Sequence, residues 1–177
     1  MNYSQISEIV DFFWSQAGYL KEKVEQESEE DKRIRDRIIE FWRWVYKNRG
    51  MIKDKLKGNY GKLLSHLSRL TVLLEKIDSE TSQWLLLSAP FVGEEFNSSF
   101  FIEYLDKFND QESIKYISKI FLEMLSTHTP WYKEENIISI VEKIYNLGNK
   151  SDADKICNIY GSRGHEFLRP IYDEFNT

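Results

Sequence analysis

The chain has 177 residues, of which 24 are basic and 29 acidic, and its net charge is −5. This length suits one domain that buries a hydrophobic core of its own. The 30% of charged and 41% of apolar residues exclude wholesale disorder, and 8 Gly and 3 Pro are too few for a turn-rich β-sandwich or barrel.

The first third of the chain predicts two long helices. The first starts at Ser4 as N-cap. Its apolar residues recur every three or four positions: Ile6, Ile9, Phe13, Ala17, Leu20 and Val24. The charged stretch 25–37 indicates the start of the second helix, because its acids lie early, at the positive end of the helix dipole. We expect this helix to run to about Asn48 and to stop at Gly50, before a short segment over 51–57.

The middle of the chain continues the helical period. One stripe consists of Leu63, Leu67, Leu70, Leu74 and Ile77. Asp78 or Ser79 then caps a short helix that Pro90 ends, and residues 91–99 are predicted to form a loop. The next apolar stripe comprises Phe101, Tyr104, Leu105 and Phe108. Asp110 is expected to cap the helix that follows it, whose apolar residues are Ile114, Ile117, Phe121 and Leu125.

The last third has clear start and stop signals. Thr129 and Pro130 predict an N-cap followed by proline at the first helical position, and Gly148 predicts the end of that helix. A second helix is expected to start near Ser151 and to end at Gly161. The final segment, 165–175, completes the series as a short helix.

These signals predict an all-α fold in a single domain over residues 1–177. Helix pairs recur at roughly 35–45 residues, which favours an irregular α-solenoid of HEAT-like pairs, with a compact multi-helix bundle as the alternative. The N-terminal helices and the charged segment occupy 1–58, and the helix-pair array occupies 59–177. The apolar arc of the second helix spans about 160°, wider than the usual stripe of a surface helix, so it needs neighbours on two sides.

The C-terminal part also shows a family resemblance. Residues 153–175 read ADKICNIYGSRGHEFLRPIYDEF, with Gly161 and Gly164 in a link before Phe167. This pattern is similar to the closing helix pair of HEAT-like C-terminal domains in large bacterial NTPase or SIR2-like proteins, many of them in anti-phage defence. The resemblance covers about residues 77–177. It implies an accessory module of a bacterial antiviral defence assembly, and it carries over no catalytic residue.

The motifs of catalysis and cofactor binding are missing from the sequence. It contains no phosphate-binding GxxxxGK[ST] loop, no GxGxxG and no GxSxG, and His165-Glu166 lacks the second histidine of a zinc-binding HExxH. We interpret Cys157, the three histidines and the pairs Glu94–Glu95 and Glu134–Glu135 as packing or surface residues. We therefore predict no enzyme, no catalytic residue, no metal and no cofactor. A hydrolase would need scattered carboxylates that converge on a bound metal.

The same residues give expectations about location. No apolar run approaches the ~20 residues of a membrane span, and residues 1–14 lack the pattern of a signal peptide. The single Cys157 cannot form an internal disulfide, which fits a reducing compartment. We expect a cytoplasmic protein without a membrane partner.

Charge is unevenly spread along the chain. Residues 32–76 hold 13 basic and 4 acidic residues, a net +9, while the rest carries −14. This segment forms either a patch for phosphates or for an acidic partner, or solvated helix faces paired with the acids of 22–31.

Trp44 is the most specific signal within this segment. On a helical wheel it lies opposite the apolar arc of the second helix, between Arg33 and Arg37. It either anchors an interface or is covered by the first helix or by residues 51–57. Because Trp and Arg dominate binding hot spots, we predict a non-catalytic scaffold whose protein partner contacts Arg33, Arg37, Arg43, Trp44 and Lys47. The alternative is a nucleic-acid-binding accessory domain that uses segment 32–76.

Overall fold

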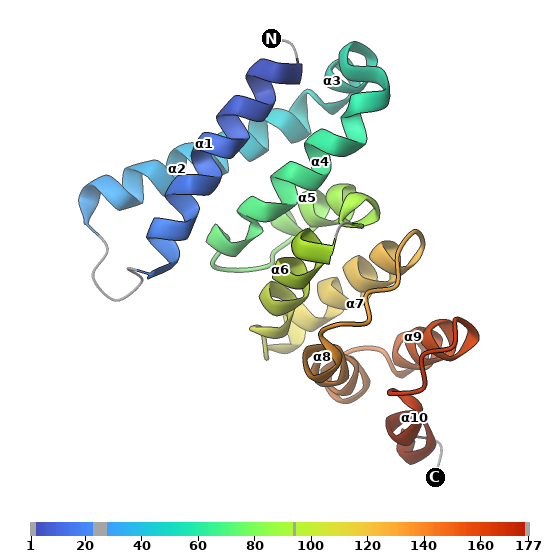
Figure 1. Ribbon diagram of the computed structural model, residues 1–177. Coiled ribbons are helices and arrows are strands. Elements are labelled where there is room, and N and C mark those ends of the chain that lie inside the picture. The colour runs from blue at the N-terminus through green and yellow to red at the C-terminus, as the bar shows by residue number, and fades with distance from the viewer. Residues whose placement is uncertain (1–2, 23–27, 94, 176–177) are drawn as a thin grey trace.

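The fold was obtained as a computed structural model that describes residues 3–22, 28–93 and 95–175. Within these ranges every regular element is helical and none is a strand, which confirms the all-α class (Figure 1). The α-helices are α1 (Tyr3–Glu22), α2 (Glu29–Lys47), α3 (Arg49–Leu56), α4 (Tyr60–Ser68), α5 (Thr81–Ser88), α6 (Glu95–Asp106), α7 (Gln111–Leu125), α8 (Glu134–Leu147), α9 (Lys150–Ser162) and α10 (Arg169–Phe175). Three 3₁₀ turns, η1 (Lys57–Asn59), η2 (Arg69–Leu73) and η3 (Ala89–Phe91), connect some of them.

Local capping signals account for several helix starts. Ser28 caps α2 in a capping box, in which its side chain accepts from the Asp31 N–H and the Asp31 carboxylate accepts from the Ser28 N–H. The Asp110 side chain accepts from the Ser113 N–H and caps α7, as predicted. At α9 the cap is Asn149, whose side chain accepts from the Ser151 N–H, so Ser151 lies inside the helix and not at its cap.

The N-terminal helices differ from the prediction at their ends. Helix α1 already includes Tyr3, so Ser4 is a helical residue and not the N-cap. Helix α2 runs to Lys47, and its C-cap Asn48, whose side-chain amide donates to the Trp44 carbonyl, is where the helix was predicted to end. The predicted stop at Gly50 is wrong, because α3 follows at once with Gly50 inside it. The segment 51–57 is therefore mostly helical. In the predicted stripe of α1, Val24 lies outside the described residues, as do the side chains of Ala17 and Leu20.

The link between α7 and α8 also differs from the prediction. Helix α8 begins at Glu134, four residues after Pro130, because tertiary contacts hold this link outside the helix. The Tyr160 hydroxyl donates to the Pro130 carbonyl at 2.8 Å, and the Thr127 hydroxyl donates to the Pro90 carbonyl at 2.7 Å. Before α6, the predicted loop 91–99 is shorter than expected, because the helix begins at Glu95.

Neighbouring helices pack in chain order. The main contacts of α7–α10 are with helices one or two places away along the chain, while α1 packs against α4 and η2. As a result, Figure 1 shows the chain progressing from α1–α4 at one end to α9 and α10 at the other. Buried side chains from Ile6 to Ile171 form the core. The proposed division between residues 58 and 59 stays a prediction.

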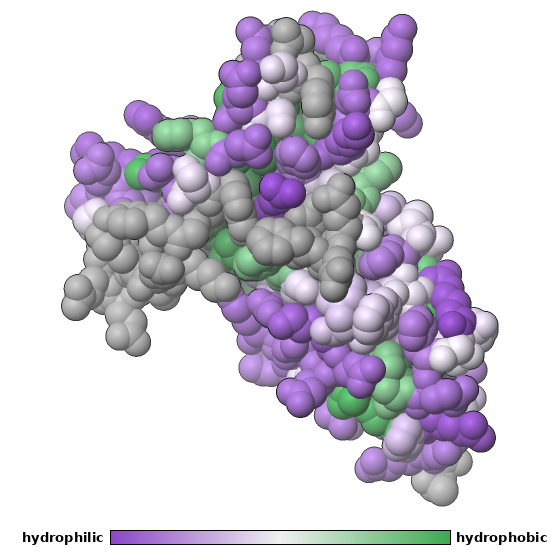
Figure 2. Space-filling view, in the orientation of Figure 1, coloured by the Kyte–Doolittle hydropathy of each residue, from purple (hydrophilic) through white to green (hydrophobic). Residues whose placement is uncertain are grey.

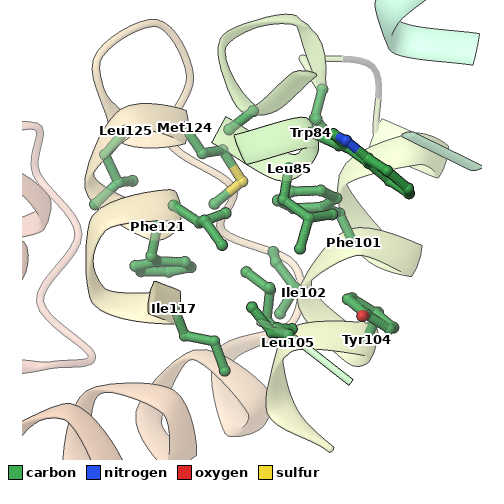
Figure 3. Packing of buried hydrophobic residues seen from close by; sticks show 14 of the residues in the cluster. Trp84, Leu85, Phe101, Ile102, Tyr104, Leu105, Ile117, Phe121, Met124 and Leu125 are labelled. Carbon is green, nitrogen blue, oxygen red and sulfur yellow. The ribbon is translucent and has the colours of Figure 1, made fainter. Parts of the chain in front are cut away.

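The core between α5, α6 and α7 is shown in Figure 3. Its buried side chains come from all three helices: Trp84, Leu85, Phe101, Ile102, Tyr104, Leu105, Ile117, Phe121, Met124 and Leu125. Burying one such side chain contributes ~1.5–3 kcal/mol. On the face visible in Figure 2 hydrophilic side chains predominate, and hydrophobic ones show in smaller patches. None of the helices in the described ranges combines the length and the apolar character that crossing a bilayer requires.

Candidate protein-interaction surface

Helix α2 is held by its apolar face. Ile38, Trp42 and Val45 are buried, and the Trp42 ring stacks on Trp84 of α5 with centroids 5.9 Å apart and an interplanar angle of 5°. Such a stacked pair adds ~0.5–1.5 kcal/mol to the burial of the two rings. This attachment fixes the rotation of α2 and turns the opposite face of the helix outward.

Four of the five predicted contact residues lie on this outward face. Arg33, Arg37, Trp44 and Lys47 are all exposed, and they lie within about 60° of Trp44 on the helical wheel. The Trp44 side chain is 37% exposed, so neither α1 nor residues 51–57 cover it, although both border it. Its ring stacks on Phe41 with centroids 6.2 Å apart, which holds the indole against the helix.

Trp44 forms one wall of an apolar hollow of about 260 Å³. The hollow lies where α1, α2 and α3 meet, and its lining residues are Ile6, Trp44, Met51, Ile52, Lys55 and Leu56. Met51 is 46% exposed, and Lys55 is the charged residue among the lining. We call these six residues, together with Arg33, Arg37 and Lys47 of α2, the Trp44 surface.

Arg43 lies on another side of α2. Its guanidinium donates two hydrogen bonds to the Glu80 carboxylate, from Nε at 2.7 Å and from Nη2 at 3.0 Å, and it lies 5.8 Å from the Trp84 ring centroid. The hydrogen bond from Arg43 lowers the pKa of Glu80, against the opposing effect of burial. The structure thus separates Arg43 from Trp44 and joins α2 to the start of α5 through it.

The basic segment 32–76 is partly neutralised by ion pairs. Lys32 pairs with Glu29, Arg35 with Glu75, Arg43 with Glu80 and Lys76 with Asp78. The last three pairs line a groove of about 540 Å³ between α2 and the η2–α5 segment, so its charges already meet one another.

The cations of the Trp44 surface are different. Within the described residues, no ion pair is found for Arg33, Arg37, Lys47 or Lys55. Three acids, Glu29, Glu30 and Glu40, share their face of α2, and the first two belong to the first turn of the helix, at the end away from Trp44. Of these cations, Lys55 lines the apolar hollow and Lys47 lies one turn after Trp44 on α2.

Sequence reasoning missed the part of this surface that α1 and α3 supply. Met51 and Lys55 lie in the basic segment 32–76 of the nucleic-acid alternative but were not predicted to contact a protein partner, and Ile6 was predicted only as a core residue of the first helix. Phe12 is 60% exposed and lies off the predicted apolar stripe of α1, next to Phe13, which packs on Phe41 with ring centroids 5.6 Å apart.

The side chains with catalytic potential that the structure describes form no metal-binding cluster. In the described parts of the chain, no three His, Cys, Asp or Glu side chains are placed to hold a metal ion. Burial raises the pKa of the Cys157 thiol to about 11, with a contribution from Asp154. Glu134 and Glu135 are exposed in the first turn of α8, as predicted. Glu94 lies outside the described residues.

The histidines also lie apart. His66 is in α4, with its Nδ1 3.8 Å from the nearer Asp11 oxygen, and His165 packs edge-on against Tyr160. His128 follows α7, and burial, with the charge of Arg163, lowers its pKa.

Comparison with known proteins gives no relative from which a role could be transferred. No protein-family model, no curated protein and no solved structure matches this chain.

Proposed function

We propose that this chain is a non-catalytic helical module that binds a protein partner through the Trp44 surface. The observation that carries the proposal is the apolar hollow between α1, α2 and α3, with Trp44 and Met51 exposed at its edge. Lys55 lines it and Lys47 follows Trp44 by one turn, and the described part of the chain shows no ion pair for either. Trp and Arg are enriched at the centres of protein interfaces, and an exposed apolar patch with a polar rim is typical of them.

The packing in chain order supports the finer architectural proposal, an irregular α-solenoid of HEAT-like pairs. In a solenoid each unit contacts its neighbours along the chain, as α7–α10 do here. Such arrays leave extended surfaces that bind partners. We extend the proposal to a cytoplasmic accessory role in a bacterial antiviral defence assembly, for which the support is the resemblance of residues 77–177.

The proposal is tested by cross-linking from within the hollow. A photoreactive benzoylphenylalanine replaces Met51 in the full chain, expressed in cells of the source organism. We expect a cross-linked protein whose yield falls at least about fivefold when Trp44→Ala is added, because the indole forms one wall of the hollow. The same photoreactive group at Leu147, an exposed apolar residue at the end of α8, is the matched control. If Trp44→Ala leaves the yield unchanged, the Trp44 surface is not the contact.

Nucleic-acid binding is the second candidate, because Arg33, Arg37 and Lys47 share the exposed face of α2. The ion pairs within segment 32–76 weaken it, since at least four of its cations already contact acids. Binding to a fluorescent single-stranded or duplex DNA of random sequence separates the two candidates. Phosphate contacts give an affinity that falls with salt in proportion to the number of phosphates neutralised. DNA binding of this kind would also be lost in the double variant Arg33→Ala/Arg37→Ala, and it would persist in Trp44→Ala.

A further inference from the structure

A second exposed tryptophan lies in the other half of the molecule. Trp131, in the link between α7 and α8, is 57% exposed, and its ring meets the neighbouring Tyr132 edge-on with centroids 5.8 Å apart. Residues 131–136 border a shallow hollow of about 400 Å³. Because more than half of Trp131 is exposed, its indole is an apolar group at the surface, and we call it the knob.

Two exposed carboxylates follow this knob in the chain. Lys133, which precedes both acids in the chain, has its Nζ 2.6 Å from the Glu103 carboxylate. Glu134 and Glu135 are exposed, and no ion pair is found for either among the described residues. The segment thus presents an indole followed by two unpaired acids.

The link that carries Trp131 is firmly held. On its N-terminal side the Thr127 hydroxyl donates to the Pro90 carbonyl, and Arg163 donates to the Thr129 hydroxyl. Directly before Trp131, the Pro130 carbonyl accepts from the buried Tyr160 hydroxyl. A side chain presented from a fixed backbone loses little conformational entropy when it is bound.

The knob and the hollow have complementary chemistry. The Trp44 hollow is apolar, with Lys55 in its lining and Lys47 beside it on α2, while Trp131 is apolar with Glu134 and Glu135 beside it. The same contrast holds over longer stretches. Residues 32–76 carry +9, and residues 77–177, with 9 basic and 17 acidic residues, carry −8.

One chain cannot bring the two together within itself. The hollow lies among α1, α2 and α3, whereas the link before α8 lies toward the other end of the molecule, with α4, α5 and α6 between them (Figure 1). We therefore infer that the partner of the Trp44 surface is a second copy of this chain, whose Trp131 enters the hollow while Glu134 and Glu135 face Lys47 and Lys55. This inference rests on the proposed function, since it names the partner of the same surface.

The inferred contact joins copies head to tail. Each copy uses its hollow for one neighbour and its Trp131 for another, so the interface is heterologous and the assembly grows with concentration. Apolar burial supplies the attraction, and the unpaired charges add to it and fix the orientation of the copies.

Sedimentation velocity on the purified chain provides the test, over about 1–200 µM, the range in which weak interfaces of this kind dissociate. We expect association that rises with concentration and weakens when NaCl is raised. Trp44→Ala and Trp131→Ala should each raise the dissociation constant at least about tenfold. The matched control is Phe91→Ala, which removes a 40% exposed ring from η3 and should leave association unchanged.

Mixing the two defective variants gives a sharper result. The Trp131→Ala chain keeps an intact hollow and the Trp44→Ala chain keeps an intact knob, so an equal mixture should form a one-to-one dimer that grows no further. Circular dichroism establishes that both variants are folded. A mixture that stays monomeric while the wild type associates would refute the knob-in-hollow contact.

The outcomes also separate this inference from the proposed function. A wild-type chain that is monomeric throughout, yet cross-links from Met51 to another protein in a Trp44-dependent way, overturns the inference and leaves the proposed function standing. If Trp44→Ala changes neither the cross-link nor self-association, both are wrong.

Discussion

Asp78 anchors the start of α5 and offers the most quantitative prediction. Its Oδ1 accepts from the N–H groups of Glu80 at 3.0 Å and Thr81 at 2.9 Å, and from the Thr81 hydroxyl at 3.1 Å. Lys76 Nζ lies 3.0 Å from Oδ2. Burial alone would raise the pKa of Asp78, but these hydrogen bonds outweigh it and lower the pKa from 3.8 to about 2.

The size of the effect follows from this shift. A lowered pKa stabilises the folded state above the pKa of the unfolded chain, and that stability is lost as the pH falls toward the folded pKa. A difference of nearly two pH units corresponds to roughly 2.4 kcal/mol at neutral pH. Because the Asp78 side chain is 32% exposed and Lys76 is 77% exposed, solvent screening reduces the expected contribution to about 1–2 kcal/mol.

Replacing Asp78 with asparagine tests this reasoning, because Asp78→Asn keeps a capping oxygen and removes the charge. We expect the free energy of unfolding at pH 7 to fall by about 1–2 kcal/mol, and the difference from the wild type to vanish between about pH 5 and pH 2. Urea titrations at a series of pH values measure both. Asp54→Asn, at an exposed carboxylate of α3, is the control. If the free energy of unfolding of Asp78→Asn differed from that of the wild type by the same amount at every pH, the charge effect would be refuted.

Other substitutions test packing, reactivity and backbone conformation. Trp84→Ala should lower the free energy of unfolding by ~3–5 kcal/mol in chemical denaturation, because the ring is buried against Trp42. Trp44→Ala, at a partly exposed ring, should lower the free energy of unfolding by less than about 2 kcal/mol. Equal decreases for Trp84→Ala and Trp44→Ala would contradict the burial of the two rings. Cys157 should react with a thiol reagent only as fast as the protein opens, and immediate labelling of the folded chain would be inconsistent with its burial. Gly164→Ala should cost about 1 kcal/mol because φ is +82° there, whereas an unchanged melting temperature would show that the link relaxes.

Much of the helical framework follows from local patterns. The predicted stripe Leu63, Leu67, Leu70, Leu74 and Ile77 is entirely buried. Yet α4 ends at Ser68, Leu70 lies in η2, and Leu74 and Ile77 lie outside any helix. Apolar spacing records which side of a segment faces the core, but it does not distinguish an α-helix from a tighter turn when tertiary contacts shorten the helix.

The candidate surface was only half predictable. The wheel of α2 placed Arg33, Arg37 and Trp44 on one exposed face, because helical geometry depends on residues a few positions apart. It could not show that Arg43 pairs with Glu80, 37 residues away, or that Met51 and Ile6 complete the hollow around Trp44.

The sequence by itself thus determined which segments are helical and which side of each faces inward, because periodicity and caps act over three or four residues. Only the tertiary structure decided which cations are paired and which apolar side chains stay exposed together. The reason is that those properties depend on contacts between α1, α2, α3 and α5, whose relative positions no local signal records.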